Sequence, residues 1–459
     1  MKTRKHWLGC FFLGSALVLG AGIARDARAE NDPALETRID TYLKPYLELK
    51  GFNGAVLIAR GGKILLRKGY GMANYELDIP NTPRTKFHIA SISKPFTAAA
   101  VMLLVERSQL SVRDPLSRFI PDYPNGEKIT LHHLLTHTSG VPNVNEFPDY
   151  DDKSKFPHTP ADLIKLFRDK SLLFEPGQRY SYSNSNYNLL AYIIEKVSGK
   201  NYGDFLRENI FDPLEMRDTG HHGDAGQLVP NRATGYVPAG LTDLENAPYI
   251  DWSIKTGNGS LYSTVDDLFK WDRALYTERI LKKSTLQTIF ENEYGWFVGK
   301  RFNRRVIRYN GRSPGFGGEI QRYVDDDTCI IVLSNNYAAT ASIIANDLAA
   351  MVFGEPYEIT KVVPPHSLDP RVLDGYAGRY QFGPDFFVPN AVYTVSRRGN
   401  LLIVSLGTSS FALVPQSETT FFVRMFWSTV RFEKNEAGEV TQLIWQYLRD
   451  YPAKRLPAD

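Results

Sequence analysis

A serine and a lysine three residues apart stand at the head of an apolar run, in F-H-I-A-S-I-S-K-P-F-T-A-A-A-V-M-L-L-V-E over residues 87–106. If a helix begins at Ser91 to Ser93, Pro95 fits its first turn, and Ser91 and Lys94 share one face. Free N–H groups at the helix start favour a developing oxyanion, and a lysine with a lowered pKa accepts the hydroxyl proton. The pattern is compatible with a serine nucleophile, but taken alone it is more typical of an N-capping serine beside a surface lysine.

A second polar stretch, F-E-P-G-Q-R-Y-S-Y-S-N, places Tyr182 two residues before Asn184 on a loop. A tyrosine near the nucleophile can act as general base or acid if neighbouring cations stabilise its phenolate. Asn184 offers a donor and an acceptor to a substrate amide. Taken alone, the triplet is more typical of a polar turn that begins the helix ending near Gly199.

Histidines raise the alternative of a metal hydrolase. His133 and His137 stand four residues apart, and His221, His222 and Asp224 follow later. The H-E-x-x-H pattern of zinc hydrolases is absent, and no carboxylate accompanies the first pair. We interpret these residues as hydrogen-bonded structural histidines and predict no metal and no cofactor.

The rest of the chain predicts elements that position these groups. Two apolar runs flank Gly61-Gly62, which indicates a β-hairpin, and strands return from residue 305 onward. A helix capped near Ser263 or Thr264 and an apolar helix over 338–353 complete the body. Proline-rich residues 359–370 are typical of a linker, and short strands over 371–459 predict a small barrel or sandwich.

The N-terminus has the layout of an export signal. Basic residues precede an apolar run from Trp7 to Ile23, and Ala27-Arg28-Ala29 provides a cleavage site. We predict a signal peptide over 1–29, a first domain over 30–358 and an exported, periplasmic or secreted protein without a stable membrane span; an uncleaved anchor is the alternative.

Charge and cysteine content narrow the class of protein. Residues 1–29 carry +4 of the formal net charge of +3, which leaves −1 for the mature chain. This near-neutral balance gives no indication of nucleic-acid or anionic-membrane binding. After cleavage only Cys329 remains, so no internal disulfide forms, and its apolar surroundings predict burial.

Six motifs in order, over about residues 35–355, resemble the class C β-lactamase, penicillin-binding-protein and carboxylesterase group of serine hydrolases. They are F-H-I-A-S-I-S-K-P-F-T, L-L-T-H-T-S-G-V, F-E-P-G-Q-R-Y-S-Y-S-N, F-D-P-L-E-M-R-D-T, G-S-L-Y-S-T-V-D-D-L and Y-N-G-R-S-P-G-F. The resemblance implies an α+β fold: an antiparallel sheet flanked by helices, an inserted mainly helical lobe, and a lipocalin-like C-terminal domain. It also implies Ser91 as acylated nucleophile, Lys94 as its partner, Tyr182 as base and Asn184 as substrate contact. The oxyanion would be bound by the backbone N–H groups of Ser91 and Arg312.

The third motif departs from the family's K-T-G or H-x-G, because this chain has Tyr309-Asn310-Gly311. Tyr309, Gly311 and Arg312 would still contact substrate, but the cation that holds a substrate carboxylate is absent at this position. Arg308 and Arg312 flank Tyr309 and, by strand alternation, should point away from its face. Lys255-Thr256-Gly257 spells K-T-G literally, but it precedes a glycine turn and a helix, and we interpret Lys255 as a loop lysine.

The resulting prediction is a serine hydrolase that acts through an acyl-enzyme on an ester, a β-lactam or a D-amino-acid peptide bond. Its partner would be a small-molecule or peptide substrate. The alternative is a penicillin-recognising binding or sensor protein with little turnover. The sequence leaves the oligomeric state and the role of the C-terminal domain open.

Overall fold

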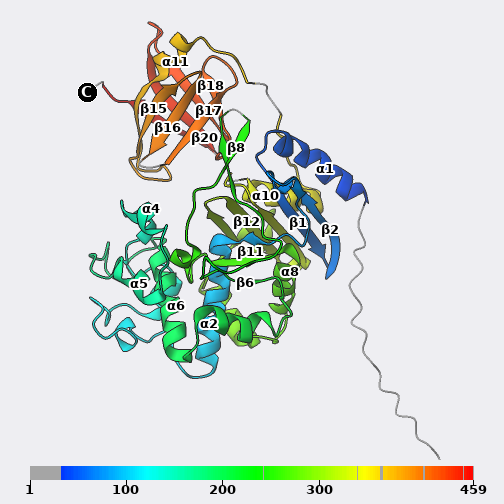
Figure 1. Ribbon diagram of the computed structural model, residues 1–459, viewed down its shortest axis with the longest axis vertical. Coiled ribbons are helices and arrows are strands. Elements are labelled where there is room, and N and C mark those ends of the chain that lie inside the picture. Colours follow the sequence, from blue (N-terminus) through cyan, green and yellow to red (C-terminus); the bar gives the residue numbers. More distant parts are fainter. Residues whose placement is uncertain are drawn as a thin grey trace, which may run out of the picture.

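The computed structural model describes residues 33–240, 242–338, 340–361, 365–406, 409–447 and 449–457, so the predicted signal peptide lies outside the described residues. Six antiparallel strands form the central sheet of the body (Figure 1). In spatial order they are β10 (Phe297–Arg301), β11 (Arg304–Ser313), β12 (Phe316–Tyr323), β13 (Thr328–Ser334), β1 (Gly54–Arg60) and β2 (Lys63–Tyr70). Strands from the two ends of the body meet where β1 pairs with β13. This confirms the predicted antiparallel sheet.

The hairpin between β1 and β2 turns at Gly61 and Gly62, whose φ angles are 58° and 73°. Two successive positive φ values define the type I′ turn, whose twist matches that of the flanking strands. Glycine takes this conformation without strain. The predicted hairpin is therefore confirmed.

Helices cover both faces of the sheet. One face packs against α1 (Pro33–Glu48) and α10 (Ala341–Phe353), and the other against α2 (Ser93–Glu106) and α8 (Val265–Ala274). Successive strand residues alternate between the two cores, because a strand's side chains point to opposite faces. On β1, Leu57 thus joins the α2 core and Ile58 the α1 core. Cys329 is buried in the α2 core and forms no disulfide, as predicted.

A mainly helical lobe is inserted between β2 and β10, as predicted, and it contributes most of the lower part of Figure 1. Its short strands are β3 (Met72–Asn74), β4 (Ile79–Pro80), β5 (Phe87–His88), β6 (Gly220–His221), β7 (Tyr236–Ala239), β8 (Asp243–Asn246) and β9 (Leu261–Ser263). Its helices besides α2 and α8 are α3 (Leu131–Leu135), α4 (Tyr150–Lys153), α5 (Pro160–Lys165), α6 (Asn184–Ser198), α7 (Tyr202–Leu206) and α9 (Lys283–Glu291). Single turns are η1 (Ala90–Ile92), η2 (Leu116–Arg118), η3 (Val144–Glu146), η4 (Arg207–Phe211), η5 (Trp252–Lys255) and, between β12 and β13, η6 (Val324–Asp326).

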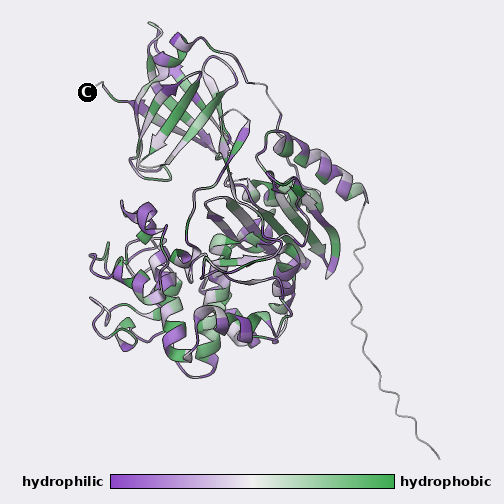
Figure 2. Ribbon diagram, viewed as in Figure 1, coloured by the Kyte–Doolittle hydropathy of each residue, from purple (hydrophilic) through white to green (hydrophobic). Residues whose placement is uncertain are grey.

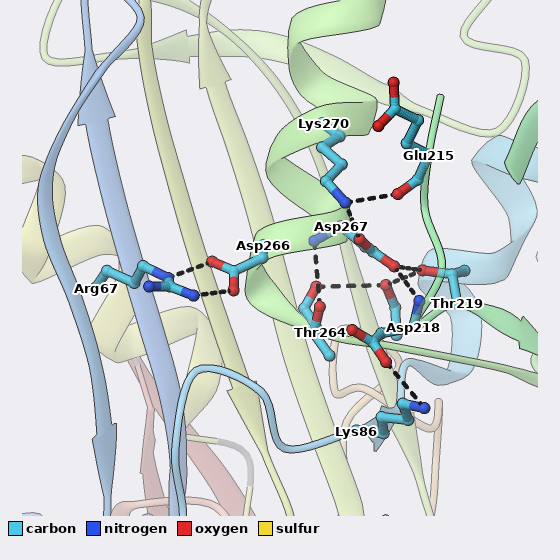
Figure 3. Close-up of polar contacts among 10 residues, drawn as sticks. Arg67, Lys86, Glu215, Asp218, Thr219, Thr264, Asp266, Asp267 and Lys270 are labelled. Atoms are coloured by element: carbon cyan, nitrogen blue, oxygen red, sulfur yellow. Dashed lines mark hydrogen bonds and ion pairs between the residues drawn. The ribbon is translucent and has the colours of Figure 1, made fainter. Parts of the chain in front are cut away.

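Polar contacts fix the start of α8, as Figure 3 shows. Thr264 caps the helix by accepting a hydrogen bond from the Asp267 backbone, as predicted from the sequence. The buried Asp267 carboxylate in turn accepts bonds from Thr219, the Asp218 backbone and Lys270. Because β9 ends one residue before Thr264 and pairs with β5, this network holds the segment that leads into Ser91.

The C-terminal unit is a closed antiparallel barrel of eight strands, which confirms the predicted small all-β domain. Figure 2 shows hydrophobic and hydrophilic residues alternating along its strands, as expected for a filled barrel. The strands are β14 (Gly378–Phe382), β15 (Val392–Arg398), β16 (Leu401–Leu406), β17 (Ser409–Pro415), β18 (Thr420–Val423), β19 (Ser428–Lys434), β20 (Val440–Tyr447) and β21 (Arg449–Arg455). A short helix not predicted from the sequence, α11 (Pro370–Tyr376), packs its Leu373 and Tyr376 into the barrel core. Across the described ranges, no helix has the length and apolar character needed to span a membrane.

The barrel contacts the body through Arg424–Trp427, the docking turn between β18 and β19. Arg424 donates to the carbonyl oxygens of Leu49, Ala239 and Asp243 at 2.8–3.0 Å. The Trp427 ring stacks on Tyr46 of α1 with 4.5 Å between centroids. The turn is therefore anchored by hydrogen bonds and by a buried aromatic pair.

Candidate active site

A crevice of about 520 Å³ lies where the lobe meets the edge of β11. Ser91, Tyr182 and Asn184 line it from the lobe, and Tyr309 and Arg312 line it from the strand. Residues that lie more than 200 positions apart in the chain thus share one cavity. The structure brings together every residue that the sequence analysis nominated for catalysis or substrate contact, with Lys94 buried beside Ser91 and Gly311 beside η1.

Ser91 lies in η1, one turn ahead of α2, with its side chain half-exposed in the crevice. The preceding residue, Ala90, has φ +47°, a conformation that non-glycine residues rarely adopt. It is held there because the Ile89 N–H donates to Leu261 of β9 at 3.0 Å and because α2 is buried along nearly its whole length. Strain of this kind persists where the surroundings over-determine it, typically at functional sites.

The Ser91 hydroxyl is within hydrogen-bond distance of two candidate proton carriers. Its Oγ lies 2.9 Å from the Tyr182 hydroxyl and 3.0 Å from Lys94 Nζ. Lys94 Nζ also donates to Asn184 Oδ1 at 2.9 Å and to the Asn258 carbonyl oxygen at 2.8 Å. Both of these partners are pure acceptors, so they fix two of the lysine's N–H bonds and orient the remaining position toward Ser91.

Burial sets the protonation of these groups. Desolvation, reinforced by the positive charge of Lys255, holds the pKa of Lys94 well below its ordinary value. Desolvation also raises the pKa of Tyr182 to about 12, although its hydrogen bond with Ser91 opposes the rise. The arrangement therefore favours a neutral amine on Lys94, which can act as a base, and a neutral phenol on Tyr182, which can act as an acid. Both lie next to the Ser91 hydroxyl.

His137 supports Tyr182 from behind. Its ring lies 4.6 Å from the tyrosine ring, and its Nδ1 accepts a hydrogen bond from the Ser183 N–H at 3.1 Å. Burial lowers the pKa of His137 to about 3, so this imidazole is neutral. It positions the loop that carries Tyr182.

The remaining histidines are dispersed in separate contacts. His133 completes the capping box of α3 with Thr130, whereas His221 bonds Ser260 and His222 bonds His88. In the part of the chain that the structure describes, no three histidine, cysteine, aspartate or glutamate side chains are grouped to hold a metal ion.

Tyr309 forms an uncharged wall of the crevice, with only 2% of its surface exposed and its ring stacked on Phe297 at 4.8 Å. Desolvation raises its pKa well above the ordinary value, so it is a neutral phenol. The two flanking arginines are engaged elsewhere: Arg308 pairs with Glu319 at 3.5 Å, and Arg312 donates to the Tyr337 carbonyl oxygen at 2.8 Å. Neither guanidinium occupies the place of the family's third-motif cation.

Gly311 is required by close packing. A Cβ at this position would lie 2.2 Å from the Ile89 carbonyl oxygen and 3.0 Å from the Ser91 nitrogen. Only glycine lets β11 approach η1 this closely. The approach brings the backbone of Ser91 against the strand that carries Arg312.

Three further residues belong to the site and were not nominated for it from the sequence. Asn258 supplies the carbonyl that fixes Lys94, and Asn145 accepts a hydrogen bond from Asn184 Nδ2 at 2.8 Å. Lys255, interpreted from the sequence as a loop lysine, is 9% exposed and lines the crevice. The G-N-G turn, which shares Gly257 with K-T-G, is the signal that the sequence offers, but only tertiary contacts place this turn beside Lys94.

Comparison with known proteins agrees with this architecture. A family model named Beta-lactamase matches residues 39–350, so the chain belongs to that family. Relatives in this family of β-lactamase-fold serine hydrolases include a penicillin-binding protein and a teichoic acid D-alanine hydrolase.

Individual relatives share both sequence and fold with the chain. It is 29% identical to a penicillin-binding protein of Bacillus subtilis over 89% of its own length and 96% of that protein. It is 28% identical to the teichoic acid D-alanine hydrolase of Staphylococcus aureus, over 71% of this chain and 80% of the relative. The structure of the octameric penicillin-binding protein homologue from Pyrococcus abyssi superposes with a TM-score of 0.63 at 26% identity, covering 92% of this chain and 99% of the other. The similarity to the last thus extends into the barrel.

Proposed function

We propose that the protein hydrolyses an ester or amide bond through an acyl-enzyme on Ser91. The single observation that carries the proposal is the position of Ser91 Oγ, 3.0 Å from a buried amine and 2.9 Å from a buried phenol. The lowered pKa of Lys94 and the raised pKa of Tyr182 suit the first to accept a proton and the second to donate one.

In the acylation step, Ser91 Oγ bonds the substrate carbonyl carbon while its proton passes to Lys94 Nζ. The carbonyl electron pair moves onto oxygen, where the backbone N–H groups of Ser91 and Arg312 would stabilise it. Collapse breaks the bond to the leaving group, which takes the Tyr182 proton, and the Lys94 ammonium reprotonates the phenolate. Water then adds to the acyl ester and loses a proton to Lys94, and Ser91 departs with the proton of Tyr182. The Lys94 ammonium again reprotonates the phenolate, which restores the starting state.

The substrate class follows from the crevice and from the relatives. The wall at Tyr309 is bulky and uncharged, which suits esters and amides whose recognition does not rest on a cation at the third motif. The relatives support a D-amino-acyl ester or amide, or a β-lactam, as the bond cleaved. We place the enzyme outside the cytoplasm, on the N-terminal signal pattern and on the named relatives.

The test uses mature protein with a short p-nitrophenyl ester, a D-alanyl ester and a fluorescent penicillin. Turnover that Ser91→Ala abolishes, with an unchanged melting temperature, supports the proposal; Ser171→Ala, at an exposed serine, is the matched control. Activity retained by Ser91→Ala would refute the assignment. A stable penicillin adduct without turnover of any substrate would instead identify the second candidate, a penicillin-recognising binding or sensor protein, which the loss of the third-motif cation favours.

A further inference from the structure

Lys255 is a buried cation in the crevice without an anionic partner. In the described part of the chain its ammonium makes no hydrogen bond and no ion pair; Nζ lies 5.2 Å from the centroid of the Tyr150 ring. The residue is 9% exposed and its ammonium reaches the crevice, where the face of one aromatic ring does not compensate its charge. Such a group is stabilised when an anion from outside the chain completes its surroundings.

Two neighbouring donors are unsatisfied as well. The hydroxyl of Tyr150 and Nδ2 of Asn258 are buried and have no hydrogen-bond partner among the described residues, and both side chains line the same crevice. Lys255, Tyr150 and Asn258, which we call the donor cluster, thus line one crevice with one charged and two neutral donor groups. Asp151 also lines the crevice, but its side chain is exposed toward solvent.

The backbone fixes this donor cluster beside the catalytic groups. The Lys255 carbonyl accepts the N–H groups of Asn258 and Gly259 at 2.9 and 2.8 Å, and the Asn258 carbonyl accepts Lys94 Nζ. Gly257 packs so tightly on α6 that a Cβ would lie 2.2 Å from the Tyr187 carbonyl oxygen. The turn over residues 255–259 is thus held rigidly between the proposed base and the open crevice.

We propose that Lys255, with Tyr150 and Asn258, binds a carboxylate of the substrate and so makes the enzyme selective for anionic esters or amides. The inference rests on the proposed function and names a substrate feature for it. One positive charge with two neutral donors matches a monoanionic carboxylate better than a dianionic phosphate. The cation absent from Tyr309 is thereby supplied from the lobe, at a different wall of the crevice.

The test measures discrimination between matched substrates. Two anionic esters, p-nitrophenyl glutarate with its carboxylate on the acyl chain and 3-carboxy-4-nitrophenyl butyrate with it on the leaving group, are compared with neutral p-nitrophenyl butyrate. Lys255→Met should lower the anionic-to-neutral ratio of kcat/KM about tenfold to a hundredfold for at least one anionic ester. Lys255→Arg, which keeps the charge, should retain most of the ratio, and Lys155→Met, at an exposed lysine outside the crevice, should leave it unchanged.

An equal loss on all three esters in Lys255→Met would overturn the inference, because Lys255 would then act only through Lys94. A binding measurement separates this failure from failure of the proposed function. By calorimetry, the Kd of glutarate should be at least about tenfold lower for Ser91→Ala than for Ser91→Ala/Lys255→Met. Glutaramide is the uncharged control. Equal glutarate affinities would also overturn the inference. If no ester is turned over but glutarate still binds selectively, the proposed hydrolase function is refuted and the proposed carboxylate site is retained.

Discussion

Replacing Gly311 by alanine should disrupt the proposed oxyanion hole without touching the proton-transfer groups. The added Cβ would lie 2.2 Å from the Ile89 carbonyl oxygen, more than 1 Å short of an ordinary van der Waals contact. This oxygen and the next neighbour, the Ser91 nitrogen at 3.0 Å, are backbone atoms that cannot rotate away, so β11 and η1 must separate. The N–H groups of Ser91 and Arg312 would then no longer converge on one oxygen.

The expected loss follows from the role of such donors. Removing one oxyanion donor typically lowers kcat about a hundredfold to a thousandfold. Overpacking in a buried contact destabilises the fold by about 1–3 kcal/mol. Gly311→Ala should therefore keep its fold, lose a few degrees in Tm and lose at least about a hundredfold in kcat on a p-nitrophenyl ester.

Gly299→Ala is the matched control, because Gly299 lies on the neighbouring strand β10 and a Cβ there meets no atom within 4 Å. This variant should retain the activity of the parent enzyme. Stopped-flow acylation separates the chemical step from any change in folding. Gly311→Ala activity within threefold of the parent, in a folded protein, would refute the backbone oxyanion hole.

Two further predictions concern protonation and stability. Because burial lowers the pKa of Lys94, kcat/KM on a neutral ester should rise with pH through that lowered pKa and level off well below pH 10. Tyr182, with its pKa raised to about 12, stays protonated over this range. A kcat/KM that still rises tenfold per pH unit up to pH 10 would contradict this prediction. Asp272 pairs with Arg322 at 2.6 Å and with Arg273 at 2.7 Å, and both Asp272 and Arg322 are buried. Asp272→Asn should therefore cost about 3–5 kcal/mol in urea unfolding, because it leaves a buried guanidinium uncompensated; a loss below 1 kcal/mol would contradict the argument.

Local patterns in the sequence were sufficient to predict the main elements of the fold. The Gly61-Gly62 turn predicts the hairpin because two positive φ values require residues of this type. The barrel strands follow from alternation, but closure depends on β14 pairing with β21, and no local signal encodes that long-range pairing. The helix α11 escaped prediction because it is short and begins with a proline inside an apparent linker.

The site shows the same division between local and tertiary information. Ser91 and Lys94 could be nominated together because helical spacing alone puts them on one face. Lys255 could not be placed, because its three-letter motif starts at the last residue of η5 and is not on a strand. Only the packing of its turn against α6 and Lys94 brings it into the crevice. Tyr150 likewise comes from a separate helix of the lobe.

The docking turn of the barrel contacts Arg312, a residue that lines the crevice. Arg312 donates to the Met425 carbonyl oxygen at 3.4 Å, and its guanidinium lies 4.9 Å from the centre of the Phe426 ring. The barrel consequently cannot be exchanged without effect on the site. Replacing it by the C-terminal domain of a relative would change the contacts that hold Arg312 beside the reacting serine. An engineer who grafts a new barrel onto this body should carry the Arg424–Trp427 segment along with it.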